Sequence, residues 1–368
     1  MICNISCLNG GVCLSNNTCI CPACYMGEQC EVCANVLDFS LTYAIHWDIR
    51  QNAVDSNFNA PELVYTTVVA VMLLIALINN IACLQTFLIQ EIRSTNCGIF
   101  QILYCFMGLL TIICMQLQML IILKFSSLSN DYSYHFLTCN ITPTLMVIMG
   151  DICMWLNVLL VIEFVLLECF NFNLYRSRKF SILSSIITII LVSSSHIQGI
   201  VARHPSPSPI EPNFYTCTFI FGSIADIFDK TIRTCHVIIP CSIDFIGSIC
   251  ILINITRRIL MVRVRKDFFQ VFINQSIKRK YFFIPPLFII IANLPHLILH
   301  LKDNCEDARD ISILRLHVAF NILAYLPLSI TFFIYIYPSE SYMHRFKKTF
   351  IGCWLRRLVS KCTSNDAK

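Results

Sequence analysis

The chain has 368 residues, of which 56% are hydrophobic and 13% are charged, and its mean hydropathy is +0.68. A typical soluble protein carries about twice that share of charged residues. Helices that are apolar on every side must be buried or lie in lipid, so the composition excludes an ordinary soluble protein and favours membrane embedding.

A cluster of cysteines lies at the start of the chain. A segment of about 30 residues cannot bury enough apolar surface to fold alone, so disulfides are expected to restrict its unfolded state. Disulfides persist in oxidising compartments, which predicts that this end lies outside the cell. Spacing alone leaves the pairing open. Six of the cysteines follow the pattern C-x3-C-x5-C-x5-C-x-C-x8-C: Cys3, Cys7, Cys13, Cys19, Cys21 and Cys30.

Two further cysteines, Cys24 and Cys33, create the sequences CPAC and CEVC. Five residues separate these two pairs, fewer than in zinc ribbons. We therefore expect a fourth disulfide, Cys24–Cys33, and no metal site. Sequons at Asn4 and Asn16 predict glycosylation if this end is extracellular.

Seven apolar runs follow, each long enough for the roughly 20 residues that a membrane-spanning helix needs. Five of them contain no charged residue, whereas the third and the fifth contain isolated charges. The sequence thus predicts an all-α membrane protein, a seven-transmembrane helical bundle with a small disulfide-rich module at the N terminus. The runs are Leu63–Gln90, Ser94–Leu123, Cys139–Phe170, Phe180–Ala202, Ile232–Ile255, Tyr281–Leu301 and Leu316–Ser339.

The distribution of positive charge gives the same orientation. With the N terminus outside, nineteen of the 27 Lys and Arg residues fall in the segments expected to be cytoplasmic, 91–93, 171–179, 256–280 and 338–368. This agrees with the positive-inside rule. The basic runs in 256–280 then indicate contact with anionic lipid or a cytoplasmic partner and not with nucleic acid. The predicted location is the plasma membrane, with the C terminus in the cytoplasm.

The N-terminal module resembles an EGF-like domain, because LNGG precedes the third cysteine and YMGEQCE closes the last loop. This resemblance implies the disulfides Cys3–Cys13, Cys7–Cys19 and Cys21–Cys30.

Residues 63–352 resemble a rhodopsin-like (class A) G-protein-coupled receptor. Asn80 matches the Asn of the family's first helix, and Cys139 and Cys217 match the cysteines that join helix three to the second outer loop. Prolines fall where helices five, six and seven have theirs, and SESYMHRFKKTFIGCW resembles the amphipathic eighth helix, with Phe346 and Phe350 one turn apart. An EGF-like module on such a bundle is similar to receptors of invertebrate expansions of the family. The three prolines are Pro240, Pro295 and Pro327.

The chain departs from the family at its switch motifs. The acid-Arg-Tyr triplet is Glu163-Phe164-Val165, and no Trp precedes Pro295. The motif around Pro327 lacks its Asn and Tyr, and Gly108 stands where the family's sodium-binding Asp is expected. Ordinary coupling to G proteins is therefore in doubt.

Polar residues within apolar runs are the candidate binding residues. A charge at the bilayer centre costs on the order of 3 kcal/mol, so Asp151 and Asp244 should face the interior and be paired or protonated. We expect them, with Asn293 and His296, to line a ligand pocket between the third, fifth and sixth helices. A hydrogen-bond network that only joins helices is the alternative. Ser195 next to His196 predicts no catalytic pair, because adjacent helical residues face different sides.

The expected organisation is an EGF-like module in 1–33, an extracellular linker in 34–62, a seven-transmembrane receptor domain in 63–337 and a cytoplasmic helix and tail in 338–368. We expect a non-enzymatic receptor without cofactors that senses an extracellular peptide or small molecule and acts on cytoplasmic transducers such as a heterotrimeric G protein. One alternative is a non-signalling adhesion or decoy protein that acts through its EGF-like module. Another is a seven-helix transporter or channel, which inverted repeats or interrupted spans would favour; the sequence shows neither.

Overall fold

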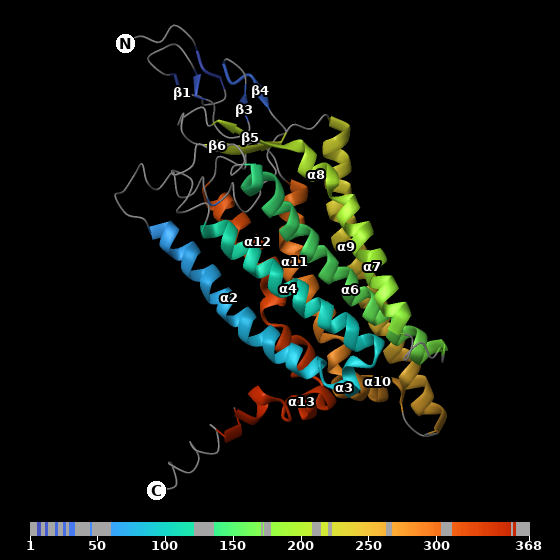
Figure 1. The fold of residues 1–368 in the computed structure, drawn as a ribbon. Helices are drawn as coiled ribbons and strands as arrows, with labels where there is room; N and C mark the ends of the chain where they lie inside the picture. Colours follow the sequence, from blue (N-terminus) through green and yellow to red (C-terminus); the bar gives the residue numbers. More distant parts are fainter. Residues whose placement is uncertain are drawn as a thin grey trace.

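The protein forms a bundle of long helices with short antiparallel strands at one end and the short helices α3, α10 and α13 at the other (Figure 1). The structure is a computed structural model. It describes residues 6–8, 12–13, 19–20, 25–26, 29–33, 45, 60–120, 136–170, 172, 178–207, 215–219, 223–262, 267–302, 311–354 and 356–357.

Five of the described helices are long and apolar enough to cross a membrane. They arise from the first five apolar runs, so the prediction of a helical membrane bundle is confirmed to that extent. α6 continues directly from the π-helix η2, Leu137–Ile141. The five helices are α2 (Ala60–Phe87), α4 (Asn96–Leu120), α6 (Thr142–Phe170), α7 (Arg178–Ser195, continued by α8, Ile197–Ala202) and α9 (Ser223–Val262).

The last two apolar runs form shorter helices that pack in the same bundle. α11, Ile284–Lys302, packs against α9 and against α12, Ile311–Ser329. The run expected to continue to Ser339 is interrupted after Ser329 and resumes as the π-helix η5, Phe332–Ile336. Pro327 lies just before this interruption and has no backbone N–H to donate.

Asn80 joins the first helix to the last. Its side-chain nitrogen donates to the carbonyl oxygens of Ala76 and Leu328, each at 2.9 Å, and its oxygen accepts from the Thr331 hydroxyl at 3.1 Å. Asn80 is fully buried. The Leu328 carbonyl oxygen, just before the interruption of α12, thereby gains a donor from α2.

The outward surface of the bundle is apolar. α6 is the most buried of the five long helices and α7 the least. Large side chains such as Ile78, Ile190, Leu191 and Ile246 are exposed. A contiguous apolar surface of this kind is unstable in water and suits lipid.

The strands lie at one end of the bundle (Figure 1). Two small hairpins pair β1 with β2 and β3 with β4, and a third pairs β5 with β6 and packs against η2. The strands are β1 (Val12–Cys13), β2 (Cys19–Ile20), β3 (Tyr25–Met26), β4 (Val32–Cys33), β5 (Arg203–Pro207) and β6 (Tyr215–Phe219).

Cys7 and Cys19 form a disulfide, one of the pairs that the EGF-like resemblance implies. Cys13, Cys30 and Cys139 are also disulfide-bonded. Cys3, Cys21, Cys24 and the sequon residues Asn4 and Asn16 lie outside the described residues, as do the side chains of Cys33 and Cys217.

The opposite end carries α3 (Gln90–Arg93), α10 (Phe268–Lys278), the 3-10 turn η3 (Lys280–Phe282) and α13 (Glu340–Phe346). The eighth helix is shorter than its sequence suggests, because α13 ends at Phe346 and a second helical turn starts at Phe350. Phe346 is buried against Phe332, with ring centroids 4.7 Å apart, whereas Phe350 is exposed. Phe346 and Phe350 therefore lie in different environments, one packed inside the bundle and one on its surface.

Candidate functional site

A polar cluster joins α6, α7 and α9 inside the apolar part of the bundle. Asp151 and Trp155 lie one turn apart on α6 and so share a face. Ser195 ends α7, His196 follows it in the turn before α8, and His236 comes from α9. We call these five residues the histidine cluster.

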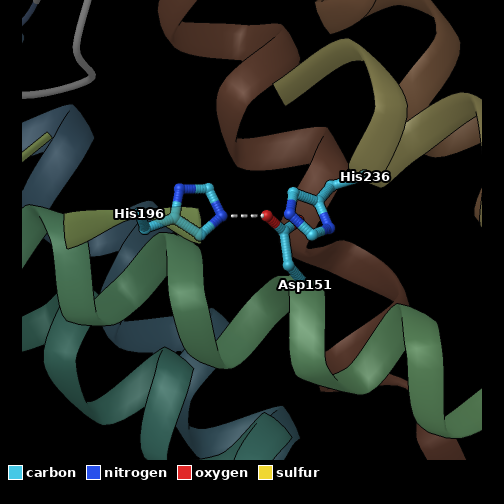
Figure 2. A group of neighbouring side chains, drawn as sticks. All are labelled: Asp151, His196 and His236. Carbon is cyan, nitrogen blue, oxygen red and sulfur yellow. Dashed lines mark hydrogen bonds and ion pairs between the residues drawn. The ribbon is translucent and has the colours of Figure 1, made fainter. Parts of the chain in front are cut away.

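The two histidines lie on either side of one carboxylate (Figure 2). His196 Nε2 lies 2.8 Å from Asp151 Oδ2, and only 4% of the His196 side chain and 15% of the Asp151 side chain are exposed. The rings of His196 and His236 stack with centroids 5.1 Å apart. One ligand atom each from Asp151, His196 and His236 lies within 4.8 Å of the others, so these residues could hold a metal ion.

The hydrogen bonds of His236 fix its protonation state. Trp155 Nε1 donates to His236 Nδ1 at 2.8 Å, and an indole N–H can only donate. Nδ1 therefore has no proton, and the ring proton sits on Nε2, which lies 2.8 Å from Ser195 Oγ. The Ser195 hydroxyl donates onward to the Val192 carbonyl oxygen at 2.8 Å. The result is a directed chain from Trp155 to the backbone of α7.

This direction has a chemical consequence. A general base must accept the proton of its nucleophile through a free ring nitrogen. His236 already carries a proton on the nitrogen that faces Ser195. His236 Nε2–H thus donates to Ser195 Oγ, which is the opposite of the direction that a Ser-His nucleophile requires.

A second cluster lies deeper in the bundle, between α4, α6, α9 and η5. Asn157 Nδ2 donates to Asp244 Oδ2 at 2.5 Å, and the Tyr335 hydroxyl donates to Asn157 Oδ1 at 3.1 Å. Tyr104 packs edge-on against Tyr335 with centroids 5.0 Å apart. Asp244 is 1% exposed, and its Oδ1 has no hydrogen-bond partner among the described residues.

The four residues expected to line one pocket are distributed differently. The described hydrogen bonds of Asp151 lead to His196 and those of Asp244 lead to Asn157, so the two acids belong to separate clusters. Asn293 donates to the Ile289 carbonyl of its own helix at 2.9 Å. Binding of a ligand by these residues, His296 included, stays a prediction.

Sequence reasoning missed four members of the histidine cluster. In the sequence His196 stands next to Ser195, and adjacent helical residues face different sides. The residue that Ser195 contacts is His236, 41 positions away. A histidine in an apolar run is a detectable signal, but the sequence does not show which helices face each other.

A cavity of about 260 Å³ opens near the end of the bundle that carries α3 and α13. Its walls include Asn157 and Phe164 of α6, Tyr335 of η5 and Tyr281 before α11. Phe164, a switch position of the resembled family, therefore lines this cavity, whereas its neighbour Glu163 is buried. The other two switch positions, Pro295 and Pro327, lie inside α11 and α12.

Charged residues surround the cavity. Glu168 on α6 lies 3.8 Å from an Arg258 nitrogen on α9 and 4.0 Å from an Arg279 nitrogen before α11. Arg345 on α13 lies 3.3 Å from Glu91 on α3. These ion pairs connect the helix ends around the cavity.

No protein-family model matches the chain, and no curated protein matches it significantly.

Proposed function

We propose that the chain is a seven-helix cell-surface receptor that senses an extracellular ligand and passes a helix rearrangement to cytoplasmic transducers. In this proposal α11 and α12 with η5 are the sixth and seventh spans. The cysteine-rich strands face outward, and α3, α10 and α13 face the cytoplasm. The apolar outer surface and the concentration of Lys and Arg at the α13 end support this arrangement.

The observation that carries the proposal is the cavity at the basic end. It is lined by residues of α3, α4, α6, η5 and α13, and by residues just before and within α11. A partner that inserts there would contact most of the bundle at once. A protein whose bundle served only as an anchor would have no need for an opening on this side.

Hydrogen bonds join α6 and α9 at three levels. Trp155–His236 lies nearest the strands, Asn157–Asp244 lies deeper, and Asn254 and Arg258 both donate to the Glu168 carbonyl oxygen at the basic end. The pair α6–α9 is thus suited to move as one unit. A ligand that alters the Trp155–His236 contact, which lies nearest the strands, would shift the helices around the cavity.

The test is Phe164→Arg, measured as basal G-protein and arrestin signalling in cells. Phe164 lines the cavity in place of the family's arginine, so a guanidinium there should raise basal signalling if its absence limits coupling. Phe164→Leu is the matched control and should leave signalling unchanged at equal surface expression. No rise with Phe164→Arg would mean that this position does not limit coupling.

A non-signalling adhesion or decoy protein is the second candidate, because Glu163-Phe164-Val165 lacks the arginine of the resembled family. This candidate expects silence in every transducer assay, with a binding partner still captured by cells that display the full chain. Ligand-dependent signalling would exclude it.

A further inference from the structure

We propose that Asp151, His196 and His236 form a binding site for a divalent transition-metal ion, and that Trp155 controls access to it. The three side chains come from two helices and an interhelical turn, and they converge with one ligand atom each within 4.8 Å of the others (Figure 2). This inference does not depend on the proposed receptor function, because metal binding can be measured without signalling.

The ligand set selects the class of metal. Two imidazoles and one carboxylate are a common zinc-binding set and also suit cobalt, nickel and copper, whereas calcium and magnesium prefer oxygen ligands. The single carboxylate offsets half of a divalent charge, which makes a buried ion less costly than an uncompensated one. Asp151 retains some exposure, so a fourth position can be filled by water.

The ligands are held before any metal binds. Asp151 and His196 are already 2.8 Å apart, and the two imidazole rings stack at 5.1 Å. Tetrahedral coordination at about 2.0–2.1 Å per bond places ligand atoms closer together than 4.8 Å, so the side chains must close around the ion. The helices bring the three ligands near enough for side-chain shifts to complete the site.

Metal binding competes with the Trp155 hydrogen bond. A neutral imidazole has one protonated nitrogen and one lone pair for bonding. A metal on His236 Nδ1 displaces the Trp155 N–H directly. A metal on Nε2 moves the ring proton to Nδ1, which then can no longer accept from Trp155. In either case Trp155 loses its partner, so the indole acts as a gate.

The experiment uses the purified full chain in lipid nanodiscs and titrates it with Co²⁺, followed by competition with Zn²⁺. Nitrogen and oxygen ligands give visible d–d absorption bands, whereas cysteine ligation adds intense thiolate charge-transfer bands at shorter wavelength. We expect d–d bands without thiolate charge-transfer bands, and we expect the d–d bands to disappear when Zn²⁺ displaces Co²⁺. Binding in the wild type should also change the tryptophan fluorescence, and this change should disappear in Trp155→Phe.

Conservative variants separate ligation from folding. His196→Gln keeps an amide that can donate to Asp151, and His236→Asn keeps an oxygen that can accept from Trp155. Each should lower Co²⁺ affinity by at least the roughly 10- to 100-fold that loss of a ligand's hydrogen-bond partner costs. His317→Gln is the matched control, because His317 on α12 is as buried as His196 but lies outside the cluster. It should bind Co²⁺ like the wild type.

Trp155→Phe tests the gate. Removal of the competing donor should raise Co²⁺ affinity by about two- to tenfold, the usual worth of one hydrogen bond. An affinity that falls or stays equal would overturn the role of Trp155. Thiolate bands, absence of binding, or equal affinity in His196→Gln and the wild type would overturn the metal site itself.

Discussion

Asn157 uses both ends of its amide, because its nitrogen donates to Asp244 and its oxygen accepts from Tyr335. It is 3% exposed, so no water replaces either partner. One residue of α6 thereby bonds one carboxylate oxygen of an acid of α9 and a hydroxyl of η5. These contacts give Asn157 a structural role as a link between three elements.

Asn157→Ala should therefore destabilise the protein by about 1–3 kcal/mol, because it leaves both Asp244 and Tyr335 without their partner. Thermal unfolding of the detergent-solubilised full chain measures the effect. Asn293→Ala is the control, since the Asn293 side chain returns to its own helix, and it should cost less than about 0.5 kcal/mol. Equal losses for the two variants would contradict the proposed network.

At the scale of elements, side-chain hydrogen bonds join α6 and α9 at three levels within the described part of the chain. At the basic end, Asn254 and Arg258 of α9 donate to the Glu168 carbonyl oxygen and so satisfy an unpaired group at the end of α6. The Glu168 carboxylate lies 3.8 Å from an Arg258 nitrogen and 4.0 Å from a nitrogen of Arg279, which precedes α11. The pair with Arg279 links the α6–α9 unit to the segment that leads into α11.

Glu168→Gln should loosen that link without disturbing the carbonyl bonds. Spin labels at the basic ends of α6 and α11, measured by pulsed electron resonance, should show a larger population at long distance. The ratio of the long-distance to the short-distance population should change by at most about fivefold, because partly exposed ion pairs contribute about 0–1 kcal/mol. Glu91→Gln, which removes the pair with Arg345, should leave this distance unchanged. An unaltered distribution in Glu168→Gln would contradict a restraining role.

At the scale of the whole molecule, the apolar runs predicted the helices because long stretches without charge admit few other structures in a chain of this composition. The first five runs became long helices, with ends that differ by several residues from the expected bounds. The interruption of α12 at Ile330 was not predicted. Pro327 indicates that the helix can kink there, but it does not specify where the helical hydrogen bonding stops or resumes.

The site was less predictable than the fold. Asp151 contacts His196 in the turn between α7 and α8, whereas the expected pocket grouped it with residues of the sixth helix. Which residue pairs with Asp151 depends on which faces of α6, α7 and α9 meet. A run that is apolar on all sides does not indicate which of its faces contacts a neighbouring helix. Phe346 shows the same limit, since only the packed structure reveals that it contacts Phe332.

The central claim is that lipid surrounds this bundle and that the strand-bearing end with the Cys7–Cys19 disulfide lies outside the cell. An epitope tag placed ahead of Cys3 and a second tag after Lys368 test it directly in transfected cells. We predict that antibody reaches the first tag on intact cells and the second only after permeabilisation. A first tag that becomes accessible only after permeabilisation of the plasma membrane would contradict the account.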